Sequence, residues 1–160
     1  MITLSVLVVL AVGLGFYSYC GRSVRAEIDI AAAPERVWQI LIDTSHYHEW
    51  QPTMIALEGV VRRGETVKLV VKTAVGERIF YPTLLVVEPN RTLAWRVRGA
   101  FPGLLHARHD FHIAAKGDGG AHFVQRERLF GWQARNLDTD AVRRNFELMN
   151  TALKDRAERR

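Results

Sequence analysis

The residues best suited to chemistry are His109 and Glu127, which lie in two predicted strands on either side of a glycine-rich turn. The turn, Lys116 to Gly120, is a strong hairpin signal between the strands Leu104 to Ala114 and Ala121 to Phe130. A hairpin centred on it places His109 opposite Glu127, with Cβ atoms about 4.5–5.5 Å apart. An imidazole and a carboxylate so placed can form a structural pair, anchor a ligand's carbonyl or hydroxyl group, or act as a general acid and base. The sequence leaves these three roles open.

Alternation along the two strands predicts which other side chains share the inner face with this pair. It places Phe111 opposite Gln125. Trp95, in the preceding strand, and Phe146 and Met149, near the C-terminus, are expected to add apolar wall. The predicted ligand-binding set is therefore Trp95, His109, Phe111, Gln125, Glu127, Phe146 and Met149. The opposite face, expected in solvent, carries Arg108, Asp110 and His112.

A long C-terminal helix, Asp138 to Glu158, is the element expected to cover this inner face. Asp138 and Thr139 supply N-cap oxygens, and basic residues at the other end suit the negative pole of the helix dipole. At about 1.5 Å per residue the helix is about 30 Å long. Its apolar stripe consists of Val142, Phe146, Met149, Leu153 and Ala157.

The chain upstream of the helix alternates mostly as strands. A first strand, Arg25 to Ala31, precedes a helix that opens at Pro34 and a short helical turn from Ser45 to Trp50. One long helix after a run of strands predicts an α+β fold in which a curved antiparallel sheet wraps around the helix. The later predicted strands are Ile55 to Arg62, Thr66 to Thr73, Gly76 to Val87 and a segment around Leu93 to Val97.

Several phrases resemble the START-like superfamily, also called SRPBCC or birch-pollen-allergen-like, and most closely its bacterial polyketide cyclase/dehydrase branch. They extend over nearly all of residues 25–158 and are Ala32 to Trp38, His48 to Pro52, Val87 to Trp95, Phe101 to Leu104, His109 to Phe111, Glu127 to Gly131 and Met149 to Lys154. The resemblance implies a helix-grip fold with an elongated apolar cavity between the sheet and the C-terminal helix. It does not fix a function, because such folds host carriers, cyclases, hydrolases and binding modules.

The first twenty residues differ in character from the rest. Ile2 to Cys20 carries no charged side chain and is about 28 Å long as a helix, close to the hydrocarbon thickness of a bilayer. Arg22 and Arg25 follow it, which under the positive-inside rule keeps the downstream domain cytoplasmic. We therefore predict a transmembrane anchor over residues 1–21, a helix-grip domain over residues 22–160 and a single-pass membrane protein. The alternatives are a cleaved signal peptide, which exports the domain, and a wrongly assigned start codon.

Composition and spacing argue against several other classes of function. The net charge of +5 comes from 22 basic and 17 acidic residues that are interleaved, and no zinc spacing or basic block indicates nucleic-acid binding. Histidines 46 and 48 with Glu49 lack a convincing metal-binding spacing, so no metal is predicted. No glycine-rich phosphate loop or nucleophile elbow is found, and no cofactor is predicted.

Two specific functions remain, beside a purely structural role as an interaction module. The first is a membrane-tethered, non-enzymatic binder or carrier of a hydrophobic small molecule such as a lipid, an isoprenoid or a polyketide. The second is a polyketide or aromatic cyclase or dehydratase that uses His109 and Glu127.

Overall fold

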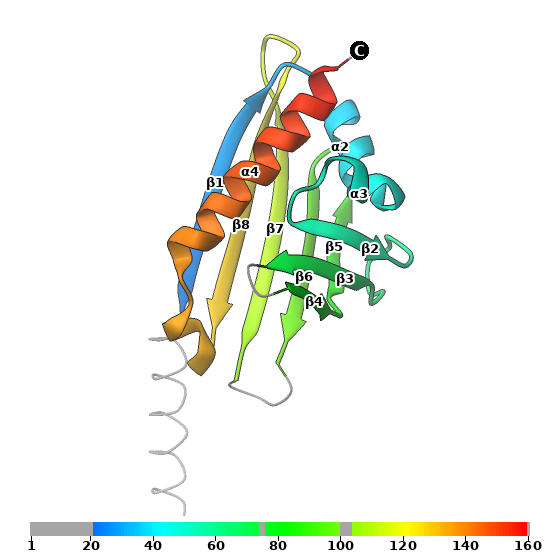
Figure 1. Cartoon of the computed structure of the whole chain (residues 1–160). Helices are drawn as coiled ribbons and strands as arrows, with labels where there is room; N and C mark the ends of the chain where they lie inside the picture. Colours follow the sequence, from blue (N-terminus) through cyan, green and yellow to red (C-terminus); the bar gives the residue numbers. More distant parts are fainter. Residues whose placement is uncertain (1–20, 74–75, 100–103, 160) are drawn as a thin grey trace, which may run out of the picture.

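A five-stranded antiparallel sheet and one long helix that lies across it make up most of the molecule (Figure 1). The computed structural model describes residues 21–73, 76–99 and 104–159. The five-stranded sheet has the order β1-β8-β7-β6-β5, and a second sheet has the order β2-β3-β4. The elements are β1 (Arg22–Ile30), α2 (Pro34–Ile42), η1 (Thr44–His46), α3 (Tyr47–Trp50), β2 (Met54–Glu58), β3 (Lys68–Thr73), β4 (Gly76–Phe80), β5 (Thr83–Glu88), β6 (Thr92–Arg98), β7 (His106–Ala115), β8 (Ala121–Phe130), η2 (Trp132–Asn136) and α4 (Thr139–Glu158).

The α+β helix-grip architecture expected from the sequence is confirmed, with two differences in the strands. The single strand expected from Gly76 to Val87 is divided into β4 and β5, which belong to different sheets. Pro82 lies at the break, where a residue without an N–H cannot continue a strand ladder. β2 ends sooner than expected, because Gly59 adopts a φ of +130° that side-chain-bearing residues rarely take.

α4 buries one face against the sheet, as its apolar spacing predicts. Asp138 caps the helix, and its carboxylate accepts hydrogen bonds from the backbone N–H groups of Asp140 and Ala141 at 3.0 and 2.9 Å. Val142 is only partly buried and packs on a separate small cluster with Phe146. The buried side chains of α4 are Phe146, Met149, Asn150, Leu153 and Ala157.

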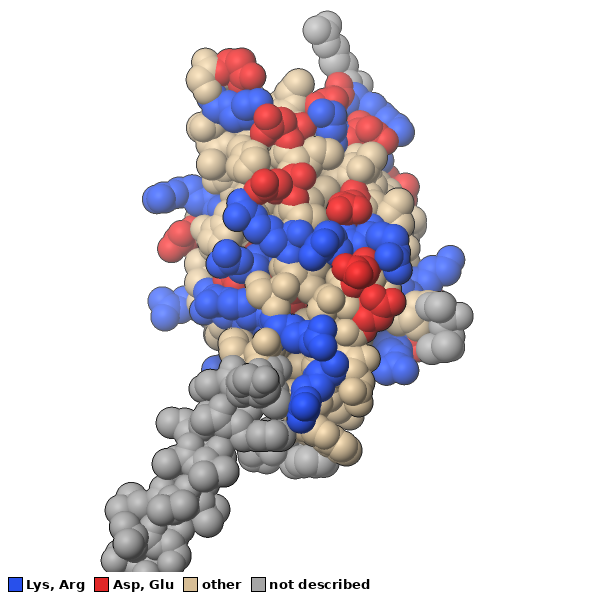
Figure 2. Space-filling model, turned by 90° about the vertical axis from the view of Figure 1, so that its left-hand side faces the viewer, with Lys and Arg blue, Asp and Glu red and all other residues tan. Residues whose placement is uncertain are grey.

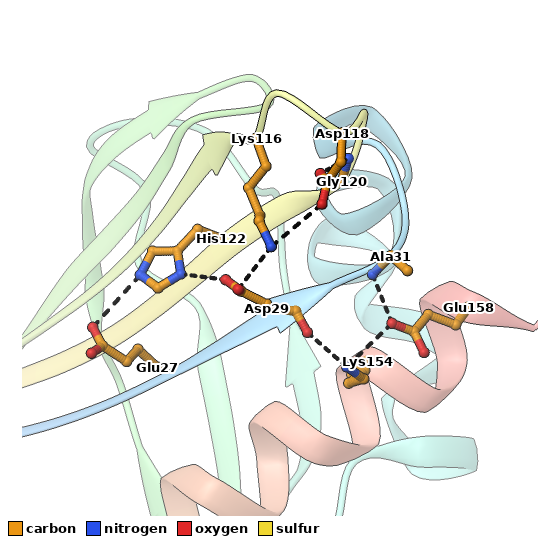
Figure 3. A network of polar contacts seen from close by, with 9 residues as sticks. All are labelled: Glu27, Asp29, Ala31, Lys116, Asp118, Gly120, His122, Lys154 and Glu158. Atoms are coloured by element: carbon orange, nitrogen blue, oxygen red, sulfur yellow. Dashed lines mark hydrogen bonds and ion pairs between the residues drawn. The ribbon is translucent and has the colours of Figure 1, made fainter.

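The C-terminal end of α4 is held to β1 by a polar network (Figure 3). Lys154 Nζ donates to the Asp29 carbonyl oxygen at 2.8 Å, and Glu158 Oε1 accepts from the Ala31 N–H at 2.7 Å. The Asp29 carboxylate in turn binds Lys116 and His122 at 2.7 Å each, and these hydrogen bonds lower the pKa of Asp29. The network ties three elements together at the end of the grip: β1, α4 and the β7–β8 hairpin.

One residue on the outer face of the sheet is buried, although strand alternation predicts that it faces solvent. Asp110, expected in solvent, is buried beneath two arginines. Its carboxylate oxygens lie 2.8 Å from Arg108 and 3.5 Å from Arg128. Figure 2 shows bands of basic side chains with acidic ones between and above them on another face of the molecule, consistent with the net charge of only +5.

The localisation predicted from the sequence needs correction. The predicted anchor, Ile2 to Cys20, lies outside the described residues. Across the ranges that are described, no helix combines the length and apolarity needed to cross a bilayer. α4 has the length, 20 residues, but charged side chains such as Arg143, Glu147 and Asp155 recur along it. Among the described residues, the predicted single-pass membrane protein, and with it the membrane as a partner, therefore finds no support.

Candidate functional site

His109 and Glu127 lie directly opposite each other in β7 and β8, so the predicted hairpin register is confirmed. The same register pairs Phe111 with Gln125. The His109 Nδ1 atom is 3.8 Å from Glu127 Oε1, within ion-pair range but longer than a hydrogen bond. The His109 side chain is 8% exposed, whereas that of Glu127 is 20% exposed. Glu127 therefore lies nearer to solvent than its partner.

Gln125 makes the shorter contact with the imidazole. Its Nε2 atom lies 2.9 Å from His109 Nε2 and 3.2 Å from the Met149 sulfur. An amide nitrogen only donates, so His109 Nε2 is the acceptor and the proton of the neutral ring is assigned to Nδ1, toward Glu127. Both ring nitrogens thus have neighbours.

The other amide atom of Gln125 has no such neighbour. Gln125 is 1% exposed, and its Oε1 atom is buried without a hydrogen-bond partner among the described residues. Buried polar atoms are nearly always paired, so an orphaned carbonyl oxygen requires an explanation. It is a buried hydrogen-bond acceptor within the group of side chains around His109.

Aromatic rings surround the imidazole. Ring centroids of Trp95, Phe111 and Phe146 lie 5.2, 4.4 and 5.0 Å from that of His109. Together with the contacts of Gln125, Glu127 and Met149, these distances place all seven predicted ligand-binding side chains in one connected group. We call this group the inner-face site. Its side chains touch one another directly, so a ligand at this position has to separate them.

Comparisons with known proteins identify the family to which the chain belongs. The family model described as "Polyketide cyclase / dehydrase and lipid transport" matches residues 21–158. The chain belongs to this family. No curated protein matches the sequence.

Solved structures similar to this cyclase/dehydrase family member are distant in sequence and close in fold. The Zhui aromatase/cyclase from Streptomyces sp. R1128 is 21% identical over 88% of this chain and 95% of that one, with a TM-score of 0.73. A START superfamily protein from Mycobacterium smegmatis is 16% identical, with coverage of 85% and 97% and a TM-score of 0.66. Hypothetical protein jhp0584 from Helicobacter pylori is 14% identical, with coverage of 86% and 88% and a TM-score of 0.74. The predicted superfamily is confirmed, and at these identities the likeness establishes the fold alone.

One buried polar residue of this family member was missed by the sequence prediction. Asn150 is 1% exposed, and in the described part of the chain neither its Oδ1 nor its Nδ2 atom has a hydrogen-bond partner. It follows Met149 directly in α4. The spacing of Asn150 could have revealed its burial, because it is four residues after Phe146 and three before Leu153, on the buried stripe of the helix. The predicted stripe contained only apolar residues, so Asn150 was not included in it.

His46, which follows α2, pairs with a carboxylate. His46 Nδ1 lies 2.8 Å from Asp43, whose carboxylate raises the pKa of His46. Within the described ranges, no group of three or more His, Cys, Asp or Glu side chains is arranged to hold a metal ion.

Proposed function

We propose that this family member binds a hydrophobic small molecule that carries a hydroxyl group, between α4 and the inner face of the five-stranded sheet. Lipids, isoprenoids and polyketide-like compounds belong to this class. The observation that carries the proposal is the buried, unpartnered Oε1 atom of Gln125 beside His109. A carbonyl oxygen only accepts, so it selects a donor on the ligand, and a hydroxyl group is the donor that such molecules commonly carry.

Energetics support a ligand at this position. A buried acceptor without a partner costs about 1–3 kcal/mol, and a ligand hydroxyl would recover that cost on binding. The surrounding rings and Met149 supply apolar contact for the rest of the molecule. Met149 has three rotatable side-chain bonds, which lets it move aside at low cost when a ligand enters.

A cyclase or dehydratase is the second candidate. It is favoured by the His109–Glu127 contact at 3.8 Å, which could act as an acid–base pair. It is disfavoured by Gln125, whose N–H group occupies the His109 nitrogen that a general base would use. In such an enzyme the substrate would have to displace the Gln125 amide first.

Organic extraction and mass spectrometry of the purified full chain test the binder directly. We expect about one equivalent of an apolar, hydroxyl-bearing compound per chain, and markedly less from Gln125→Leu. Gln133→Leu, at an exposed position in η2, is the matched control and should retain the compound. Circular dichroism checks that each variant folds. Equal recovery from Gln125→Leu and the wild type would contradict the proposed anchor.

A further inference from the structure

A pocket lies outside the inner-face site. It has a volume of about 230 Å³ and opens between α2, the turn after α2, α3 and the last turn of α4. In Figure 1 these elements meet near the C-terminal end of the chain. We call it the helix pocket; its lining includes Arg36, Ile40, Asp43, His46, Trp50 and Arg156, and none of the seven inner-face residues.

One positive charge in the helix pocket, that of Arg36, has no acidic partner among the described residues. Asp43 pairs with His46 at 2.8 Å, and Arg156 is fixed by Glu49 at 2.6 Å. Over residues 21–73, 76–99 and 104–159, by contrast, no carboxylate lies within ion-pair distance of Arg36. The pocket is left with one unbalanced guanidinium group, and a guanidinium binds a carboxylate in a two-point, planar arrangement.

One wall of the helix pocket is apolar and fixed in place. Trp50 is partly buried and packs edge-to-face on Tyr47, with ring centroids 5.5 Å apart. Tyr47 is completely buried, and its hydroxyl group donates to the Leu41 carbonyl oxygen at 2.6 Å. Ile40, 7% exposed, adds to the apolar lining. The indole ring is therefore held in position before any ligand arrives.

We propose that the helix pocket binds a small carboxylate with one flat ring. The carboxylate would pair with Arg36, near the second guanidinium of Arg156, and the ring would lie against Trp50. The size fits this class: an apolar cavity of about 150 Å³ is enough for benzene. The same volume is too small for most lipids, isoprenoids and polyketide-like compounds, the class proposed for the inner-face site, since pockets for drug-sized ligands are about 300–1,000 Å³.

Benzoate titrated into the full chain, followed by calorimetry, tests this site. For a ligand this small we expect saturable binding with a Kd of roughly 1 mM. Arg36→Gln should weaken it about tenfold or more, because a charged hydrogen-bonded pair is lost. Trp50→Leu should also weaken it. Benzamide, which lacks the charge, and acetate, which lacks the ring, should each bind more weakly than benzoate.

Arg78→Gln is the matched control, since it removes an exposed arginine from β4, away from the pocket. An equal loss of affinity in this variant would indicate general attraction of anions and would overturn the site. So would the absence of saturation, or acetate binding as tightly as benzoate. If Trp50→Leu does not fold, Arg36→Gln still tests the site, because Arg36 is exposed and its replacement should not affect folding. Arg36→Gln should leave unchanged the amount of apolar compound extracted from the inner-face site. The two proposals can therefore fail independently of each other.

Discussion

Asn150 permits a direct test of whether unpaired polar groups between α4 and the sheet lower the stability of the protein. It is 1% exposed, and among the residues that the structure describes its amide oxygen and nitrogen are both without hydrogen-bond partners. Asn150→Leu keeps a side chain of comparable size and removes both polar atoms. We expect this variant to be more stable than the wild type.

The magnitude follows from the two orphaned atoms. Each unsatisfied buried polar group costs about 1–3 kcal/mol, so removing two recovers about 2–6 kcal/mol at most. Leucine branches at the same atom as asparagine but is tetrahedral and bulkier there, and misfit in a packed interior costs about 1–3 kcal/mol. Taking the middle of each range, the expected net gain in the free energy of unfolding is about 2 kcal/mol. With a urea m-value of about 1–3 kcal/mol/M, the unfolding midpoint should rise by roughly 1 M.

Asn145→Leu is the control for this prediction, since Asn145 lies on the exposed side of the same helix. It makes the same change in helix propensity without burial, and should shift stability by less than about 0.5 kcal/mol. The difference between the two variants isolates the buried polar atoms. A loss of more than about 1 kcal/mol in Asn150→Leu, at unchanged m-value, would refute the reasoning: it would mean that the Asn150 amide is well paired in solution.

Three further predictions concern the packing, the polar pair and the pH dependence. Phe146→Ala should lower the free energy of unfolding by about 3–5 kcal/mol in urea denaturation, while Leu148→Ala, at a 57% exposed position, should change it little. A double-mutant cycle with His109→Leu and Glu127→Leu should give a coupling energy of about 1 kcal/mol, and strictly additive effects would show that the side chains do not interact. Lys116 and His122 lower the pKa of Asp29 in the folded protein. The stability that the Asp29 carboxylate contributes is therefore complete above pH 3.8, its ordinary pKa, and is lost as the pH falls through the lower pKa of the folded state. Asp29→Asn should therefore lose less stability than the wild type between pH 5 and about pH 2, and equal acid sensitivity would count against the network.

The register of the inner-face site could be predicted because it depends on local sequence. The glycine-rich turn from Lys116 to Gly120 fixes which residues oppose one another, and a period of two then decides which face each side chain takes. The same holds for α4, whose stripe follows from a period of 3.6. The residue types on these elements therefore predicted which side chains lie together in the inner-face site, and the strand register alone was enough for those of β7 and β8.

Contacts between distant segments could not be predicted in this way. The helix pocket requires Arg156 to meet Glu49, 107 residues away, and no periodicity encodes that approach. The choice of Gln125 rather than Glu127 as the close partner of His109 depends on side-chain rotamers, which the strand register does not fix. Asp110 was misplaced for a related reason: alternation assigns a face, but two neighbouring arginines can bury a carboxylate on the outer one.

The central claim is that a hydroxyl-bearing apolar ligand binds at the inner-face site through Gln125. A crystal structure of the full chain with its extracted compound tests this claim most directly. We predict a ligand hydroxyl within hydrogen-bond distance of Gln125 Oε1, with the apolar body against Trp95 and Phe146. A ligand bound elsewhere, or one that leaves Gln125 Oε1 without a partner, would contradict it.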